Sequence, residues 1–382
     1  MEQVRTQAIG DFLSRIADEI SISETMQKKA VASYEAVGRY LDEGIDYQIA
    51  IMPQGSMNLG TTIRPLSDAD DGYDIDLVCL INNSNLELSD IKNIVGDRLK
   101  ASARYSGKID SEGKRCWTLH YDGFHMDILP CVPRYVRFLK PTNTDIKLTH
   151  KVGVKQYIPK YSNPYQYQRW FESCMENVLV SMREAYANSV CCSVDQVPTY
   201  VIRTPLQKAV QLLKRHRDIY FMDNDADSPI SIIITTLAAH AYSGEIDLYD
   251  ALQHIIRKMP QHIEKRDNKY WIPNPTMSDE NFADKWNESP SKAEAFQKWI
   301  NQAQIDLVEA PLTCFGIHNF RAAFGKCLGE APASRVAAGY GTQAKAAADR
   351  DSLGIRRGSG LLTSQTTSSG VIKTERHNFY GE

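Results

Sequence analysis

The chain has 382 residues, of which 42% are hydrophobic and 24% are charged, and its formal net charge is −3. This length can hold one large domain or two lobes, and the composition is ordinary for a soluble globular protein. No apolar run approaches the ~20 residues of a membrane span, and the first residues lack the basic-then-apolar pattern of a signal peptide. We therefore expect a cytoplasmic protein without a membrane partner.

The charge balance also argues against nucleic acid as a partner. Proteins that grip nucleic acid present Lys and Arg along a basic face, whereas this chain has 44 Lys and Arg against 47 Asp and Glu. Of its eight cysteines, only Cys191-Cys192 are adjacent, and no second Cys or His pair follows at zinc spacing. We expect neither structural zinc nor a disulfide framework, as is typical of a reducing compartment.

The N-terminal half predicts an α+β core with a mixed sheet. The sequence Ser21-Ile22-Ser23-Glu24 fits a capping box for the second of two N-terminal helices. Hydrophobic alternation and β-branched residues mark four strands. The predicted helices are 2–20, 22–43 and 86–105, and the predicted strands are 45–52, 73–81, 114–121 and 124–132.

The second half is predicted to be mainly helical. Residues 165–187 and most of 205–328 fit helices, with Pro205 tolerated in the first turn of its helix. Several helix breakers within 260–290 indicate a loop region between helices. The predicted organisation is a core with N-terminal helices over 1–200 and a helical lobe over 201–330.

Beyond residue 331 the composition changes to Ala, Gly, Ser and Thr without apolar periodicity, so we expect residues 331–382 to form a disordered tail. The run Gly339-Tyr340-Gly341-Thr342-Gln343-Ala344 matches a dinucleotide-binding pattern. That interpretation is rejected, because the run follows no predicted strand and has no paired acidic residue.

Three acidic residues carry the chemistry of the core. Asp74 and Asp76 sit two apart on a predicted strand, so they point the same way with Cα atoms ~7 Å apart. Asp127 lies on a later strand entered through the Asp122-Gly123 turn. If the two strands are neighbours, the three carboxylates form an oxygen-only site suited to Mg²⁺. Two such ions can activate a hydroxyl and stabilise a leaving pyrophosphate.

A Gly-Ser turn precedes the carboxylates. The strand over 45–52 leads into Gln54-Gly55-Ser56, and a short helix there would have Ser56 as its N-cap. Gly55 permits close backbone approach, and N–H groups at a helix start face an anion. A nucleoside triphosphate fits that position.

Each motif alone has a simpler explanation. An isolated Asp-x-Asp is more often an acidic surface turn, and a Gly-Ser pair is usually only a turn. A calcium-binding EF-hand loop counted from Asp68 needs Gly at its sixth position and Glu at its twelfth, where this chain has Tyr73 and Cys79. A chance match is improbable because all three motifs occur in one order: the Gly-Ser turn, then Asp-x-Asp on an apolar strand, then a single Asp on a later strand.

With these motifs the chain resembles the polymerase-β-like nucleotidyltransferases. More narrowly, it resembles the CD-NTase family, bacterial relatives of cyclic GMP-AMP synthase and oligoadenylate synthase that make cyclic oligonucleotide signals for anti-phage defence. The resemblance covers residues 1 to about 330 and continues into segments 207–218 and 229–234. It implies a polymerase-β-like core with a mixed sheet and a C-terminal helical lobe.

The resemblance also implies roles for individual residues. Asp74, Asp76 and Asp127 are expected to be catalytic and to hold two Mg²⁺ ions, with Mn²⁺ able to replace them. Asp127 would serve the attacking ribose hydroxyl and take its proton. The donor triphosphate is expected between the two lobes, and the product is a cyclic di- or trinucleotide. The residues expected to bind the triphosphate are Gln54, Gly55, Ser56, Lys214 and Ser231.

Some of these residues have alternative explanations. The basic run of the predicted helix that begins at Pro205 could be a solvated helix face; it consists of Lys208, Lys214, Arg215 and Arg217. Ser231 could simply cap a buried helix. His125 shares a strand face with Asp127, but its spacing favours a sheet residue over a ligand.

Other activities also fit the motifs. Rival functions are a protein-modifying nucleotidyltransferase that transfers AMP to a partner, a template-independent RNA-extending enzyme and a non-enzymatic binding module. In some family members a conjugation machinery joins mobile C-terminal ends to targets. The terminal Phe379-Tyr380-Gly381 could be such an address, although Glu382 after Gly381 departs from a small-residue end.

Overall fold

The computed structural model describes residues 2–66, 72–135, 144–189, 193, 202–364, 366 and 370–374. The chain divides into two compact units. The sheet unit comprises Ile22–Ser173 and Ile272–Phe282, and the helical unit comprises Met1–Ser21, Cys174–Trp271 and Ala283–Glu382. The first helix therefore belongs to the helical unit, and the boundary differs from the one expected at residue 200.

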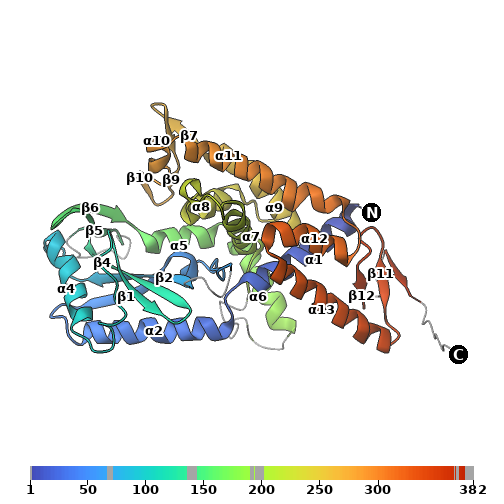
Figure 1. The fold of residues 1–382 in the computed structure, drawn as a ribbon, viewed down its shortest axis with the longest axis horizontal. Coiled ribbons are helices and arrows are strands. Elements are labelled where there is room, and N and C mark those ends of the chain that lie inside the picture. The colour runs from blue at the N-terminus through green and yellow to red at the C-terminus, as the bar shows by residue number, and fades with distance from the viewer. Residues whose placement is uncertain are drawn as a thin grey trace. The chain divides into compact units, whose positions relative to one another are not determined.

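The sheet unit is built on a six-stranded mixed sheet, of which β1, β2, β4, β5 and β6 are labelled in Figure 1. The strand order is β1-β2-β4-β5-β6, and β3 pairs with β4 at the side. The pair β2 and β4 is parallel, and the other pairs are antiparallel. This confirms the predicted mixed sheet. The strands are β1 (Ile49–Gln54), β2 (Tyr73–Ile81), β3 (Trp117–Tyr121), β4 (Phe124–Pro133), β5 (Ile146–Gly153) and β6 (Gln156–Ser162).

Alternation along β2 separates the core from the acidic residues. Ile75, Leu77 and Cys79 are fully buried and share one apolar core with residues of α2 and α4. Because successive side chains on a strand point to opposite faces, Asp74 and Asp76 lie on the other face of the sheet. The remaining elements of this unit are α2 (Glu24–Asp42), α3 (Gly55–Asn58), α4 (Leu88–Lys100), α5 (Pro164–Ser173), β9 (Pro273–Asn274) and β10 (Met277–Asn281).

The helical unit is organised around α7 (Pro205–Tyr220). Its residues Leu206, Ala209, Val210 and Leu213 are fully buried, and Thr204 closes its start with a capping box to Gln207. Proline at the first helical position agrees with the prediction. The other helices are α1 (Glu2–Ile20), α6 (Glu176–Ser189), α8 (Ser231–Ala241), α9 (Leu248–Lys258), α10 (Asp284–Glu288), α11 (Ser291–Gln304), α12 (Ile317–Leu328) and α13 (Glu330–Asp349).

Short segments of both units were not predicted. The region 260–290 contains short strands and α10 as well as loops, and β5 and β6 were missed because their exposed residues break the two-residue alternation. The further strands of the helical unit are β7 (Glu264–Arg266), β8 (Lys269–Trp271), β11 (Gly354–Arg356), β12 (Leu362–Thr363) and β13 (Val371–Lys373).

The predicted capping box of the second helix is wrong. Ser23, not Ser21, is the N-cap of α2, and its side chain accepts a hydrogen bond from the Met26 N–H. The hydroxyl of Ser21 instead donates to the Ala17 carbonyl at 2.6 Å. The shift of two residues arises because Ser21 is still tied to the end of α1.

The structure differs from the predicted disordered tail over residues 330–349, which form α13 in contact with α1 and α12 (Figure 1). Its buried residues are Ala333, Val336, Tyr340, Ala344 and Ala347, spaced at helical intervals. Alanine is the best helix former and small residues allow close packing, so an Ala-rich composition concealed a packed helix. The terminal segment Phe379-Tyr380-Gly381 and the Cys191-Cys192 pair lie outside the described residues.

No helix within the described ranges is both long and apolar enough to cross a membrane.

Candidate active site

Parallel pairing of β2 and β4 brings the acidic residues to one face of the sheet. Asp76 is paired with Asp127, and Asp74 is paired with His125. These positions alternate with the buried residues of both strands, so all four side chains share the face opposite the apolar core. Asp76 and Asp127 are half-buried, whereas Asp74 is exposed.

The end of β1 approaches the same face. Gln54 pairs with Asp76 in the antiparallel register, and Gly55 follows with a φ of +64°. A Cβ atom built on Gly55 would lie 2.1 Å from Oδ2 of Asp76, so only glycine allows this approach. The Gly-Ser turn therefore lies directly against the carboxylate of Asp76.

The predicted role of Ser56 as an N-cap is wrong. The helix α3 begins at Gly55 with Gln54 as its N-cap, so Ser56 occupies the second helical position. The Ser56 hydroxyl lies 3.1 Å from the Thr62 hydroxyl. Ser56 stays a candidate ligand because it follows the glycine that contacts Asp76.

The electrostatics of this face favour a cation. Desolvation, followed by the charge of Asp127, raises the pKa of Asp74, while His125 acts in the opposite direction. Like charges on adjacent strands repel, and a bound cation relieves that repulsion. Carboxylate oxygens are the donors that Mg²⁺ prefers, so the donor set fits the predicted ion. Within the described ranges, however, no three His, Cys, Asp or Glu side chains already converge into a metal site.

The predicted ligands of the helical unit lie on α7 and α8. Lys214 is only 4% exposed, so the solvated-face interpretation does not apply to it. Ser231 is the first residue of α8, and Ile230 is the N-cap, so Ser231 does not cap this helix.

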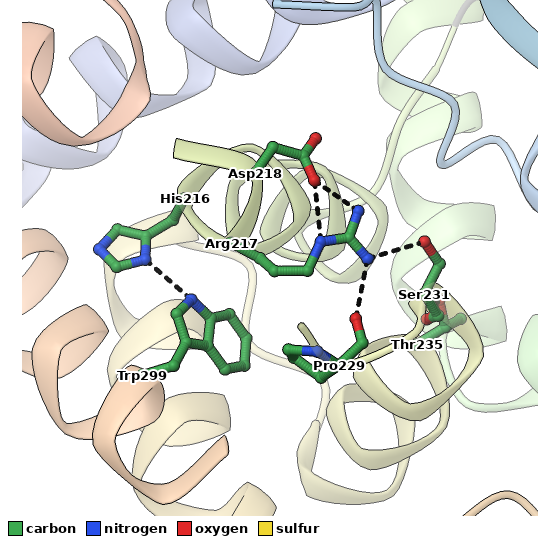
Figure 2. Close-up of polar contacts among 7 residues, drawn as sticks. All are labelled: His216, Arg217, Asp218, Pro229, Ser231, Thr235 and Trp299. Carbon is green, nitrogen blue, oxygen red and sulfur yellow. Dashed lines mark hydrogen bonds and ion pairs between the residues drawn. The ribbon is translucent and has the colours of Figure 1, made fainter. Parts of the chain in front are cut away.

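Sequence reasoning treated Arg217 only as part of a charge run, but it organises the start of α8 (Figure 2). Its Nη1 donates to the Ser231 hydroxyl at 3.1 Å and to the Pro229 carbonyl at 3.0 Å, while Nη2 pairs with Asp218 at 2.6 Å. The sequence offered one signal for Arg217. It follows Lys214 by three residues, so the two side chains are neighbours on the surface of one helix.

A mixed sheet with acidic residues on adjacent strands and a Gly-Ser turn against one of them defines the class of polymerase-β-like nucleotidyltransferases. Residues 7–151 match the family described as Second Messenger Oligonucleotide or Dinucleotide Synthetase domain. A c-di-GMP synthase of Roseivirga ehrenbergii is 32% identical over 301 residues, which are 76% of each chain. The chain belongs to the CD-NTase family: it is a nucleotidyltransferase and makes a cyclic nucleotide product.

Three further comparisons agree. The cyclic dinucleotide synthase CdnG of Bradyrhizobium diazoefficiens is 28% identical over 315 residues, covering 76% of this chain and 73% of that protein. The solved structure of CdnG in complex with GTP has a TM-score of 0.69 at 24% identity and covers 87% of this chain and 99% of CdnG. The structure of the cyclic AMP-GMP synthase DncV of Vibrio cholerae has a TM-score of 0.51 at 15% identity. The match covers 86% of this chain and 87% of DncV. These similarities confirm the fold.

Proposed function

We propose that this enzyme uses GTP to make c-di-GMP. The observation that carries the proposal is the 32% identity to a c-di-GMP synthase over 76% of the chain. CdnG, whose solved structure contains GTP, supports guanine as the base. The pairing of Asp76 on β2 with Asp127 on β4 supplies the carboxylates that nucleotidyl transfer requires.

In this proposal the three carboxylates divide the work. CD-NTases generally use divalent metal ions, and Asp74, Asp76 and Asp127 would hold two Mg²⁺ ions, with Mn²⁺ as a substitute. When bound, such ions lower the barrier by activating a hydroxyl and stabilising the leaving pyrophosphate. Asp127 accepts the proton of the attacking ribose hydroxyl, and the oxygen of that hydroxyl forms the new bond to the α-phosphorus. A second transfer closes the ring.

The remaining predicted residues would bind the donor triphosphate. Gly55 places no side chain in front of the backbone N–H groups at the start of α3, and Ser56 adds a hydroxyl donor. Gln54 completes this turn. Lys214 would supply a positive charge and Ser231 a second hydroxyl, which are the donor types that phosphate oxygens accept.

The biological setting belongs to the same proposal. The product would be a second messenger in bacterial anti-phage signalling, made in the cytoplasm without nucleic acid as the activator. A partner that reads or conjugates the C-terminal end would link the enzyme to other proteins. The near-neutral charge of the chain supports activation without a nucleic-acid duplex.

A product assay tests the function directly. Purified protein is incubated with one labelled nucleoside triphosphate at a time and with all four, in Mg²⁺ or Mn²⁺, and then treated with phosphatase. We expect a phosphatase-resistant product from GTP alone that matches c-di-GMP in chromatography and mass, and none from an Asp76→Asn control. Label that stays on protein would indicate AMP-type transfer to a partner, and a phosphatase-sensitive product would indicate linear chains.

A further inference from the structure

The carboxylate of Asp127 is held by a neighbour that the sequence did not reveal. Thr118 on β3 lies directly opposite Asp127 in the antiparallel register of β3 and β4. Its Oγ1 donates to Oδ1 of Asp127 at 2.6 Å. That distance is within the range of charge-assisted O–H···O⁻ bonds, which are about twice as strong as neutral ones.

A threonine suits this task for two reasons. Its branched Cβ restricts χ1, so the hydroxyl is held in few orientations, and directly opposed residues of an antiparallel pair lie close together. The thiol of Cys116, the residue just before β3, lies 3.8 Å from the Thr118 hydroxyl. Because the single O–H of Thr118 donates to Asp127, this hydroxyl can only accept a hydrogen bond from the Cys116 thiol.

The hydroxyl orients Asp127 without neutralising it. A carboxylate has about four lone-pair positions, and the bond from Thr118 uses one of them on Oδ1. A Lys or Arg at this place would offset the negative charge that a proton acceptor needs. A hydroxyl restricts rotation of the carboxylate and leaves that charge in place.

We propose that Thr118 is a positioning residue for the reaction: its hydroxyl fixes the orientation in which the Asp127 carboxylate accepts the proton of the ribose hydroxyl. The inference rests on the proposed role of Asp127 and adds a residue to it. Groups that orient a metal-binding or reacting side chain typically change activity by about 10–100-fold when they are removed.

The test compares Thr118→Val, which has the same shape without the hydroxyl, with Thr118→Ser, which keeps the hydroxyl. We expect Thr118→Val to lower kcat by about 10–100-fold with KM for GTP within about twofold of the wild type. Thr118→Ser should retain most of the activity.

A matched control comes from the same sheet. Thr149 on β5 is fully buried, and its hydroxyl has no hydrogen-bond partner in the described part of the chain. Thr149→Val makes the identical chemical change away from the carboxylates and should leave kcat unchanged. Melting temperatures of all three variants separate a folding defect from a catalytic one.

The outcomes are distinguishable from failure of the proposed function. If Asp127→Asn is inactive while Thr118→Val has wild-type kcat, only the positioning role is overturned. If Thr118→Ser is as impaired as Thr118→Val, packing of the methyl group and not the hydroxyl is responsible, and the inference also fails. An active Asp127→Asn would instead reject the role of Asp127 itself.

Discussion

The backbone of Gly55 lies against the carboxylate of Asp76, so that a Cβ atom at position 55 would be 2.1 Å from Oδ2. The contact joins the Gly-Ser motif to the Asp-x-Asp motif, which are separate in the sequence. Pairing of Gln54 with Asp76 at the end of β1 produces it. Strand pairing thus explains why position 55, just before Ser56, is occupied by glycine.

Gly55→Ala should therefore impair catalysis more than folding. The added methyl group would displace the Asp76 carboxylate, and alanine at a φ of +64° costs about 1 kcal/mol of stability. We expect loss of most product formation with a small decrease in melting temperature. Gly123→Ala is the control, since Gly123 also has a positive φ of +86° but has nothing within 4 Å of its built Cβ. Equal losses of activity in both variants would contradict this explanation.

The carboxylates themselves give the second prediction. Asp74→Ala, Asp76→Ala and Asp127→Asn should each abolish product formation and leave the circular dichroism spectrum unchanged. An amide is a poor ligand for Mg²⁺ and cannot accept the proton of a hydroxyl. Substantial wild-type turnover in any one variant would reject its place in the proposed site.

How much of the site was predictable follows from what a single sequence contains. The alternation along β2 predicted that Asp74 and Asp76 share a face, and the turn at Asp122-Gly123 predicted the β3–β4 hairpin. The alignment of Asp76 with Asp127 depends on which strands pair and in which register, and a local pattern does not encode that information.

The contacts that support the site were less accessible still. Thr118 reaches Asp127 only through the register of β3 and β4, and Arg217 reaches Ser231 only through the packing of α7 on α8. The helix α13 was missed for another reason: its buried face consists largely of alanine, which hydrophobic periodicity scores weakly. Sequence patterns predicted many of the helices and strands, and tertiary pairing decided the contacts.

The buried lysine of α4 gives a prediction about pH. Lys92 is fully buried and its Nζ donates to the Gly113 carbonyl at 2.9 Å. Burial, the largest cause, lowers the pKa of Lys92 to about 8 from 10.5. Between these two values the unfolded chain binds more protons than the folded one, so stability contributed by this group rises with pH. Below about pH 8 Lys92 is protonated in both the folded and the unfolded chain, so the full cost of burying its charge remains.

The measurement is the free energy of unfolding by urea for wild type and Lys92→Met between about pH 8 and pH 9.5. The wild type should gain on the variant with rising pH, by at most about 1.4 kcal/mol per pH unit. Lys28→Met on α2 is the control, because the Lys28 side chain is 71% exposed. A difference between wild type and Lys92→Met that does not change with pH would show that Lys92 titrates normally.

The bond between Arg217 and Ser231 predicts coupling in GTP binding. If Ser231 binds the triphosphate and Arg217 positions it, Arg217→Met and Ser231→Ala should each raise KM for GTP by about 5–10-fold, as expected for one lost hydrogen bond. The double variant should be little worse than either single one, because both remove the same interaction. Steady-state kinetics of the three variants measure this. Additive effects would mean that the two residues act separately.

The last prediction concerns α13, which lies where a disordered tail was expected. Tyr340 stacks on Phe12 of α1 with ring centroids 5.8 Å apart, and the guanidinium of Arg15 lies 4.2 Å from the Tyr340 ring. Tyr340→Ala removes a large buried ring and should cost about 3 kcal/mol of stability, whereas Tyr340→Phe keeps both ring contacts and should cost little. A chain ending at Leu328 should therefore melt at a clearly lower temperature than the full chain. An unchanged melting temperature on that truncation would show that α13 does not contribute to the stability of the helical unit.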